Sequence, residues 1–229
     1  MIRLVVVVEG QTEEAFVKEV LCPHLAARQV FTSAMIVATR RDPRTGAKSK
    51  GGGRRWAKWR NDIDKVLRTE ASPQLRVTTL FDLYALPLDF PGADEHGELP
   101  DTVRRACVLE AAMAGAFDDW RLVPYLQRHE FEALVIAGID QLPALLDPVH
   151  HAAVAALGAE VAGIAPEDVN DSEHTAPSKR LLKHLGATYE KVTLGTLVTI
   201  AAGLPAIRAA CPRFDAWVTT LENLATETP

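Results

Sequence analysis

Acidic residues follow two apolar segments of the chain, and these residues are the best suited to chemistry. Glu9 ends an apolar run over residues 4–8, and Asp82 ends a β-rich segment over residues 76–81. The carboxyl ends of parallel strands meet at one sheet edge, where crevices form sites. Two carboxylates there repel unless a cation lies between them, and Mg²⁺ is often held by one or two carboxylates plus phosphates. The pair therefore predicts a divalent-metal site; the alternative is that either acid merely caps a helix or turn.

A third acidic motif follows the segment 121–127. Glu130 and Glu132 are two residues apart, so they point apart on a strand and lie about 200° apart on a helix. We therefore expect only one of them to face the site. The spacing alone leaves open which of the two it is. His129 is interpreted either as a hydrogen-bonding residue or proton relay beside the site, or as a surface histidine.

The elements that must position these acids alternate along the first part of the chain. The predicted strands cover residues 2–8, 30–39, 76–81 and 121–127. The first predicted helix has Thr12 as its N-cap, and two further helices are predicted over residues 54–69 and 102–117. A long loop is predicted over residues 84–101. The pattern β-α-β-α-β-α-β indicates an α/β fold, a four-stranded, mainly parallel sheet flanked by helices.

The second part of the chain is predicted to be helical. The expected segments lie near residues 140–147, 149–162, 176–186, 191–202 and 205–224. We therefore expect two parts, an α/β domain over residues 1–137 and a helical subdomain over 138–229 packed on it. Lys179, Arg180, Arg208 and Arg213 lie in this second part, and we expect them to be mostly solvated.

Composition narrows the class of protein. The chain has 229 residues, of which 48% are hydrophobic and 24% charged, which suits one globular domain with elaborations. No apolar stretch has transmembrane length, and the first strand lacks a signal-peptide cleavage site, so we expect a cytoplasmic protein without a membrane partner. Cys22, Cys107 and Cys211 are scattered, which argues against a disulfide framework and a zinc site; we expect them to be reduced and buried.

Positive charge is concentrated in one segment. Residues 40–60 contain nine Lys/Arg and one acid, a net charge of +8, whereas the rest of the chain carries −13. Such clusters neutralise phosphates in a salt-dependent way, so we expect nucleic-acid contacts from Arg40, Arg41, Lys48, Lys50, Arg54, Arg55 and Lys58. The alternative is a solvated loop. Trp56 and Trp59 have helical spacing, which favours core packing over base stacking.

These motifs resemble the Toprim domain, a small α/β fold with a glutamate after its first strand and an Asp-x-Asp pair after its third. Glu9 fits the first motif. Asp82 fits the first aspartate of the pair, but Tyr84 stands where the second is expected. The resemblance implies that Glu9, Asp82 and Glu132 or Glu130 bind one or two Mg²⁺ or Mn²⁺ ions, or that Glu9 acts as a general acid/base.

More closely, nearly the whole chain resembles a bacterial family of Toprim-like proteins described only as a domain of unknown function, DUF4276. The resemblance rests on the order of short motifs around Glu9, Asp82, residues 127–134, residues 176–180 and residues 207–217. It implies a metal-dependent nuclease acting on DNA or RNA. It also implies an ATPase partner in a bacterial anti-phage or mobile-element system.

Two other functions remain open from the sequence. Tyr84 in place of an aspartate favours a non-catalytic Toprim-like binding or regulatory module, with the helical part as a docking surface. A small-molecule phosphatase would use the same carboxylates but would not need the basic segment.

Overall fold

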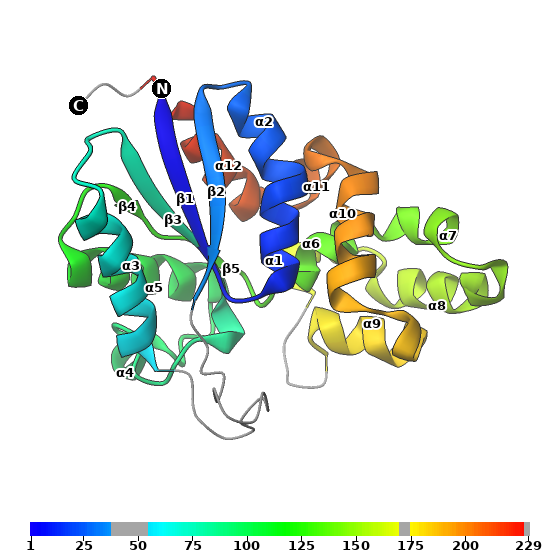
Figure 1. Cartoon of the computed structure of the whole chain (residues 1–229). Helices are drawn as coiled ribbons and strands as arrows, with labels where there is room; N and C mark the ends of the chain where they lie inside the picture. Colours follow the sequence, from blue (N-terminus) through cyan, green and yellow to red (C-terminus); the bar gives the residue numbers. More distant parts are fainter. Residues whose placement is uncertain (38–54, 170–174, 227–229) are drawn as a thin grey trace, which may run out of the picture.

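A five-stranded parallel sheet forms the centre of the molecule. In the computed structural model, which describes residues 1–37, 55–169 and 175–226 (Figure 1), the strand order is β2-β1-β3-β4, with β5 also paired to β3. The strands are β1 (Ile2–Val8), β2 (Val30–Ile36), β3 (Leu75–Asp82), β4 (Leu122–Val123) and β5 (Leu126–Gln127). All pairings are parallel. The predicted fold class, a mainly parallel sheet flanked by helices with a helical C-terminal part, is confirmed.

The fourth predicted strand is divided in two. β4 pairs with Val77 and Thr78, and β5 pairs with Phe81 and Asp82. Pro124 lies between them and has no N–H to donate to the ladder. The hydroxyl group of Thr79 bridges the gap, because it donates to the carbonyl of Tyr125 at 2.8 Å and accepts from its N–H at 2.9 Å.

Helices cover both faces of the sheet (Figure 1). Those of the first part are α1 (Gln11–Phe16), α2 (Cys22–Ala26), α3 (Trp56–Thr69), α4 (Ala93–His96), α5 (Thr102–Phe117) and α6 (Glu132–Ala137). A π-helical segment, Val17–Leu21, joins α1 to α2. α1 begins with Gly10 as N-cap, so the prediction of Thr12 in that role was wrong.

The C-terminal part is helical as predicted, with more breaks than expected. Its helices are α7 (Leu142–Leu145), α8 (His151–Val161), α9 (Pro177–Leu185), α10 (Thr196–Ala202), α11 (Leu204–Ala210) and α12 (Pro212–Asn223). The predicted helix over 205–224 is two helices, because Pro212 starts a new one after Cys211. A π-helical segment, Lys191–Gly195, leads into α10.

The side chains of β1 point alternately into two separate hydrophobic cores. Leu4, Val6 and Val8 pack with α1 and the C-terminal helices. Val5 and Val7 pack on the other face with α3 and α5. A strand buried on both faces reads as a continuous apolar run, which is how β1 was recognised. The sheet and the C-terminal helices thus share one core.

Two smaller expectations have mixed outcomes. All three cysteines are free, but only Cys211 is buried; Cys22 is partly buried and Cys107 is exposed. Among the described residues, no single helix has the length and hydropathy to span a membrane, although the bent pair Lys191–Ala202 and Leu204–Ala210, at 91°, meets both criteria together.

Trp217 of α12 ties the C-terminal part to the sheet. Its indole N–H donates to the Thr78 hydroxyl at 2.9 Å, and its ring stacks on Tyr125 at 4.5 Å. We predict that Trp217→Ala lowers the free energy of unfolding by about 3–5 kcal/mol, because it removes a buried aromatic side chain and its hydrogen bond. Urea denaturation measures this change.

The matched control is Trp120→Ala. Trp120 is 58% exposed and lies over the Arg76 guanidinium at 4.2 Å. An exposed side chain of this kind contributes less than about 1 kcal/mol. Equal losses for the two variants would contradict the anchoring role of Trp217.

Candidate functional site

Glu9 and Asp82 lie at the topological switch point of the sheet. The chain leaves β1 toward β2 on one side and returns to β3 on the other, so a crevice opens between the carboxyl ends of β1 and β3. Glu9 follows β1 and Asp82 ends β3. The Asp82 N–H donates to Glu9 Oε1 at 2.8 Å. The two residues predicted to share a site are therefore in direct contact.

Glu13 is a third carboxylate at this edge, and the sequence analysis did not identify it. It lies in the first turn of α1 and is buried. Its Oε2 atom is only 3.2 Å from the position that a Cβ at Gly10 would occupy. Gly10 therefore lets α1 begin close enough to the strand end for Glu13 to approach Glu9 and Asp82.

Asp82 also fixes the segment that carries the remaining acids. Its Oδ1 atom accepts a hydrogen bond from the Phe131 N–H at 2.8 Å. Burial raises the pKa of Asp82 well above its ordinary value, and Glu9 and Glu13 raise it further. Glu132 and Glu130 add smaller effects in the same direction. Asp82 thus experiences four other carboxylates.

Glu130 and Glu132 have different surroundings. Glu130 accepts hydrogen bonds from the N–H and the hydroxyl of Ser178, at 2.5 and 3.0 Å, and so caps the N-terminus of α9. Glu132 is 1% exposed. Its Oε1 atom pairs with Lys191 Nζ at 2.6 Å and accepts from the Tyr189 hydroxyl at 3.4 Å. Glu132 is therefore the acid paired with a cation, and Glu130 supports a helix.

Lys191 and Tyr189 were not identified from the sequence. Both come from the chain around the π-helical segment Lys191–Gly195. Gly195 permits a close approach, since a Cβ there would lie 3.4 Å from the Tyr189 hydroxyl oxygen and 3.8 Å from Thr12 Cγ2. π-Helical turns are frequent at functional sites, but a lone lysine at a helix start gives no sequence signal for them.

Five acidic side chains lie at this edge of the sheet. We call them the carboxylate cluster: Glu9, Glu13, Asp82, Glu130 and Glu132. Burial and the neighbouring Glu130 raise the pKa of Glu132, although Lys191 opposes them. Burial by itself would lower the pKa of Lys191. The pKa is nevertheless raised, because the effect of the nearby carboxylates is larger than that of burial; these are Glu132, Glu130 and Asp82. Lys191 is thus held by Glu132, and protons or further cations at this edge would reduce the repulsion among the carboxylates.

The donor set fits a hard divalent cation in one respect and not in another. Carboxylate oxygens at a strand-end crevice are suitable ligands for Mg²⁺ or Mn²⁺. Within residues 1–37, 55–169 and 175–226, however, no three His, Cys, Asp or Glu side chains are arranged to hold a metal ion together. The arrangement is thus compatible with an ion held by two carboxylates and completed by water and substrate oxygens.

His129 is not a surface residue, so that interpretation was wrong. It is 2% exposed and has a positive φ of 64°. Burial, together with the nearby Arg128 and Arg105, lowers the pKa of His129 to about 4. The imidazole is therefore neutral at pH 7. Its carbonyl accepts from the Tyr84 N–H at 3.1 Å, which places Tyr84 beside His129.

The predicted nucleic-acid contacts are only partly described. Arg40, Arg41, Lys48, Lys50 and Arg54 lie outside the described residues. Arg55 and Lys58 are exposed at the start of α3, where the Trp56 N–H donates to Asp89 at 2.9 Å. Trp56 and Trp59 are buried, which confirms core packing.

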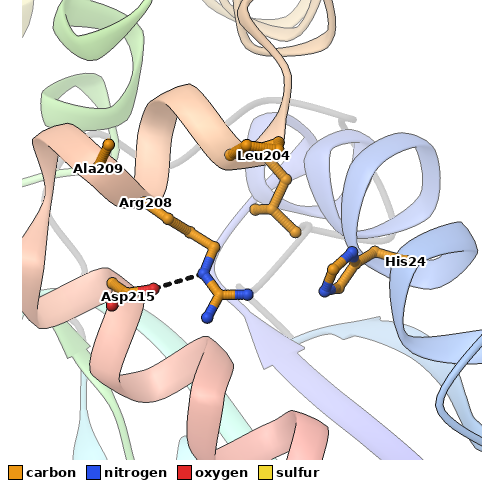
Figure 2. A pocket seen from close by; sticks show the side chains of 6 residues that line it. His24, Leu204, Arg208, Ala209 and Asp215 are labelled. Atoms are coloured by element: carbon orange, nitrogen blue, oxygen red, sulfur yellow. Dashed lines mark hydrogen bonds and ion pairs between the residues drawn. The ribbon is translucent and has the colours of Figure 1, made fainter.

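The basic residues of the C-terminal part make ion pairs within the protein. Arg208 pairs with Asp215 at 2.5 Å and with Glu222 at 2.7 Å, beside a cavity of about 340 Å³ that His24 and Leu204 also line (Figure 2). Arg180 pairs with Glu160, and Arg213 pairs with Glu110. The expectation that these arginines are mostly solvated was wrong. Lys179 is exposed.

A family model described as a domain of unknown function, DUF4276, matches residues 8–222. The chain belongs to this family. The DUF4276 match begins at the end of β1 and ends within α12, so it includes the whole carboxylate cluster together with Tyr189 and Lys191. Neither the curated proteins nor the solved structures contain a match to the chain.

The raised pKa of Asp82 predicts how stability depends on pH. An acid whose pKa rises on folding binds its proton more tightly in the native state. Its stabilising contribution is therefore greatest below the unfolded pKa of about 3.9 and is lost as the pH rises toward the folded pKa. We predict that Asp82→Asn becomes progressively more stable than the wild type as the pH rises above about 4.

Each tenfold change in proton affinity corresponds to about 1.4 kcal/mol. Urea denaturation in metal-free buffer across this pH range measures the difference. Asp94→Asn, which changes an exposed aspartate of α4, is the matched control. Parallel pH profiles for Asp82→Asn and the wild type would contradict the electrostatic description of the cluster.

Proposed function

We propose that this protein is a divalent-metal-dependent phosphoryl-transfer enzyme of Toprim type, a nuclease that acts on DNA or RNA. The observation that carries the proposal is the contact between Glu9 and Asp82 at the β1/β3 switch point, inside a partly buried cluster of carboxylates. The Toprim resemblance drawn from the sequence motifs supports the proposal, since it assigns metal binding to Glu9, which follows β1, and to Asp82, which ends β3.

In this proposal Glu9 and Asp82 hold Mg²⁺ or Mn²⁺. When bound, the ion polarises a phosphodiester, activates water and stabilises the leaving oxygen. Asp82 keeps its orientation through the Phe131 N–H, and Glu9 through the Asp82 N–H. Both carboxylates are thus positioned before a substrate arrives, which lowers the cost of reorganisation during the reaction.

Lys191 supplies a second positive charge at the same edge. Its ammonium group is half exposed, and Glu132 holds it at 2.6 Å. A partly exposed cation beside carboxylates is suited to contact a phosphate oxygen as negative charge develops. Glu132 therefore acts here by positioning Lys191, and Glu130 acts by holding α9 through Ser178.

The distribution of charge supports a nucleic-acid substrate. The segment 40–60 has a net charge of +8 in a chain of net charge −5. Arg55 and Lys58 are exposed where α3 begins, and the Trp56–Asp89 hydrogen bond ties this point to the loop that follows β3. Basic side chains beside an acidic edge bind the phosphate backbone and position it at that edge. A small-molecule phosphatase would not need this segment.

The resemblance also supports a partner. We propose that the nuclease works with an ATPase in a bacterial anti-phage or mobile-element system.

A second candidate function is a non-catalytic binding or regulatory module. Two observations favour it. Tyr84 stands in place of the second aspartate, and no three acidic or His/Cys side chains in the described ranges are arranged as metal ligands. In this case the cluster would hold protons rather than a catalytic ion.

The two functions are distinguished by Glu9→Gln. The change keeps the side-chain shape and an oxygen that accepts from the Asp82 N–H, but it removes the charge. We predict that metal-dependent cleavage of DNA or RNA falls by at least about 100-fold while the fold is retained, because one ligand charge of the ion is lost. The assay uses linear and supercoiled DNA and RNA with Mg²⁺ or Mn²⁺.

Glu19→Gln is the matched control, since Glu19 is an exposed glutamate on the helical segment that follows Glu9. Its cleavage rate should equal that of the wild type. If the wild type shows no cleavage beyond that of Glu9→Gln with any substrate, with and without a neighbouring ATPase, the nuclease proposal fails and the binding module replaces it.

A further inference from the structure

A cavity of about 250 Å³ lies beside the carboxylate cluster, and the proposed function does not yet use it. Leu83 and Tyr84, which directly follow Asp82, line it together with Leu88, Glu98, Arg105 and Leu109. Two residues of chain span at most about 7 Å, so Tyr84 is within one nucleotide's reach of Asp82. The cavity is smaller than the sites of drug-sized ligands, which are about 300–1,000 Å³.

The aromatic ring of Tyr84 is partly exposed at this cavity and is held in place by its neighbours. Its ring is 43% exposed, although aromatic side chains usually contribute buried area. His129 contacts it edge-on with ring centroids 5.1 Å apart, and the Arg105 guanidinium lies 5.8 Å from the ring centroid. The Tyr84 N–H is fixed by the His129 carbonyl at 3.1 Å. The ring is therefore oriented before any ligand binds.

Polar groups at the cavity are incompletely paired. Arg105 donates from Nη1 to the Gly97 carbonyl at 3.0 Å, but its buried Nε has no hydrogen-bond partner within the described part of the chain. Buried polar atoms without partners are rare in native proteins. Glu98, which also lines the cavity, is exposed. Arg105 and Glu98 thus bring opposite charges to the lining of an otherwise largely apolar space.

We propose that this cavity binds one unpaired nucleobase of the substrate strand, next to the phosphate held at the carboxylate cluster. A planar base stacks on Tyr84, its acceptor atoms meet Arg105, and its donor atoms meet Glu98. The opposite charges of Arg105 and Glu98 favour a neutral ring with donors and acceptors over a phosphate. This inference rests on the proposed function and adds the substrate class, a single-stranded nucleic acid.

The preference for single strands follows from the need to insert a whole base into the cavity. A base in a duplex is stacked and paired, so it must be extruded at a cost of a few kcal/mol before it can enter a pocket. An unpaired base enters without that cost. Stacking on one aromatic side chain is worth roughly a tenfold change in affinity or more.

The test is binding without catalysis. Fluorescence anisotropy in EDTA measures the affinity for a labelled single-stranded oligonucleotide, made as DNA and as RNA, and for the same sequence as a duplex. Tyr84→Ala should weaken single-strand binding about tenfold, whereas Tyr84→Phe should retain it because the ring remains. Duplex binding should be unchanged by both. Tyr84→Ala should weaken the binding of single-stranded DNA and RNA to the same extent, because base stacking needs no contact with the sugar.

Trp120→Ala is the matched control, because Trp120 is also an exposed ring against an arginine, Arg76, and lies outside the cavity. It should bind like the wild type. Three results would each overturn the proposal. Tyr84→Ala could bind like the wild type, Tyr84→Phe could lose as much affinity as Tyr84→Ala, or Tyr84→Ala could lose as much affinity for the duplex as for the single strand. Base binding that responds to Tyr84 without any metal-dependent cleavage would retain the cavity and reject the nuclease.

Discussion

Electrostatic repulsion among buried carboxylates is the constraint on which this site depends. The topology brings the ends of β1 and β3 together, and α1 and the 129–132 segment add further acids at the same edge. Such a cluster is unfavourable unless protons, hydrogen bonds or cations compensate it. Here the N–H groups of Asp82, Phe131 and Ser178 each donate to a carboxylate of the cluster, and Lys191 supplies one charge. Burial raises the pKa of Asp82 and Glu132, and the repulsion that remains uncompensated raises both further.

The same interactions explain why the C-terminal helices belong to the site. Ser178 of α9 is the partner of Glu130, and Lys191, at the π-helical entry to α10, is the partner of Glu132. The core on that face of the sheet is continuous from β1 through α1 to α12. Removing the helical part would therefore uncover the sheet and also remove the cation nearest to the acids.

The sequence predicted the elements whose signals are local. The apolar run of β1, the acids that end β1 and β3, and the helix at 102–117 all follow from short-range patterns and were found within one or two residues of their positions. Glu9 and Asp82 were placed at one edge because parallel strands with helical crossovers bring their carboxyl ends together.

The remaining features depend on tertiary contacts. Glu13 lies in the first turn of α1, and its close approach to Gly10 brings it into the cluster. Lys191 and Tyr189 enter through the close packing at Gly195, which leaves no pattern in the sequence. His129 is buried and has a positive φ of 64°, and no local pattern in the sequence predicts either property. Pro124 and Pro212 did carry local signals for the breaks at β4/β5 and α11/α12.

The central claim is that the carboxylate cluster holds a divalent cation between Glu9 and Asp82. Anomalous diffraction from a crystal soaked in Mn²⁺ tests this claim most directly. We expect an anomalous peak at about 2.1–2.2 Å from oxygens of both carboxylates, with water completing the coordination. Two carboxylates that keep their present contacts with no peak between them, at a Mn²⁺ concentration that fills ordinary carboxylate sites, would contradict it.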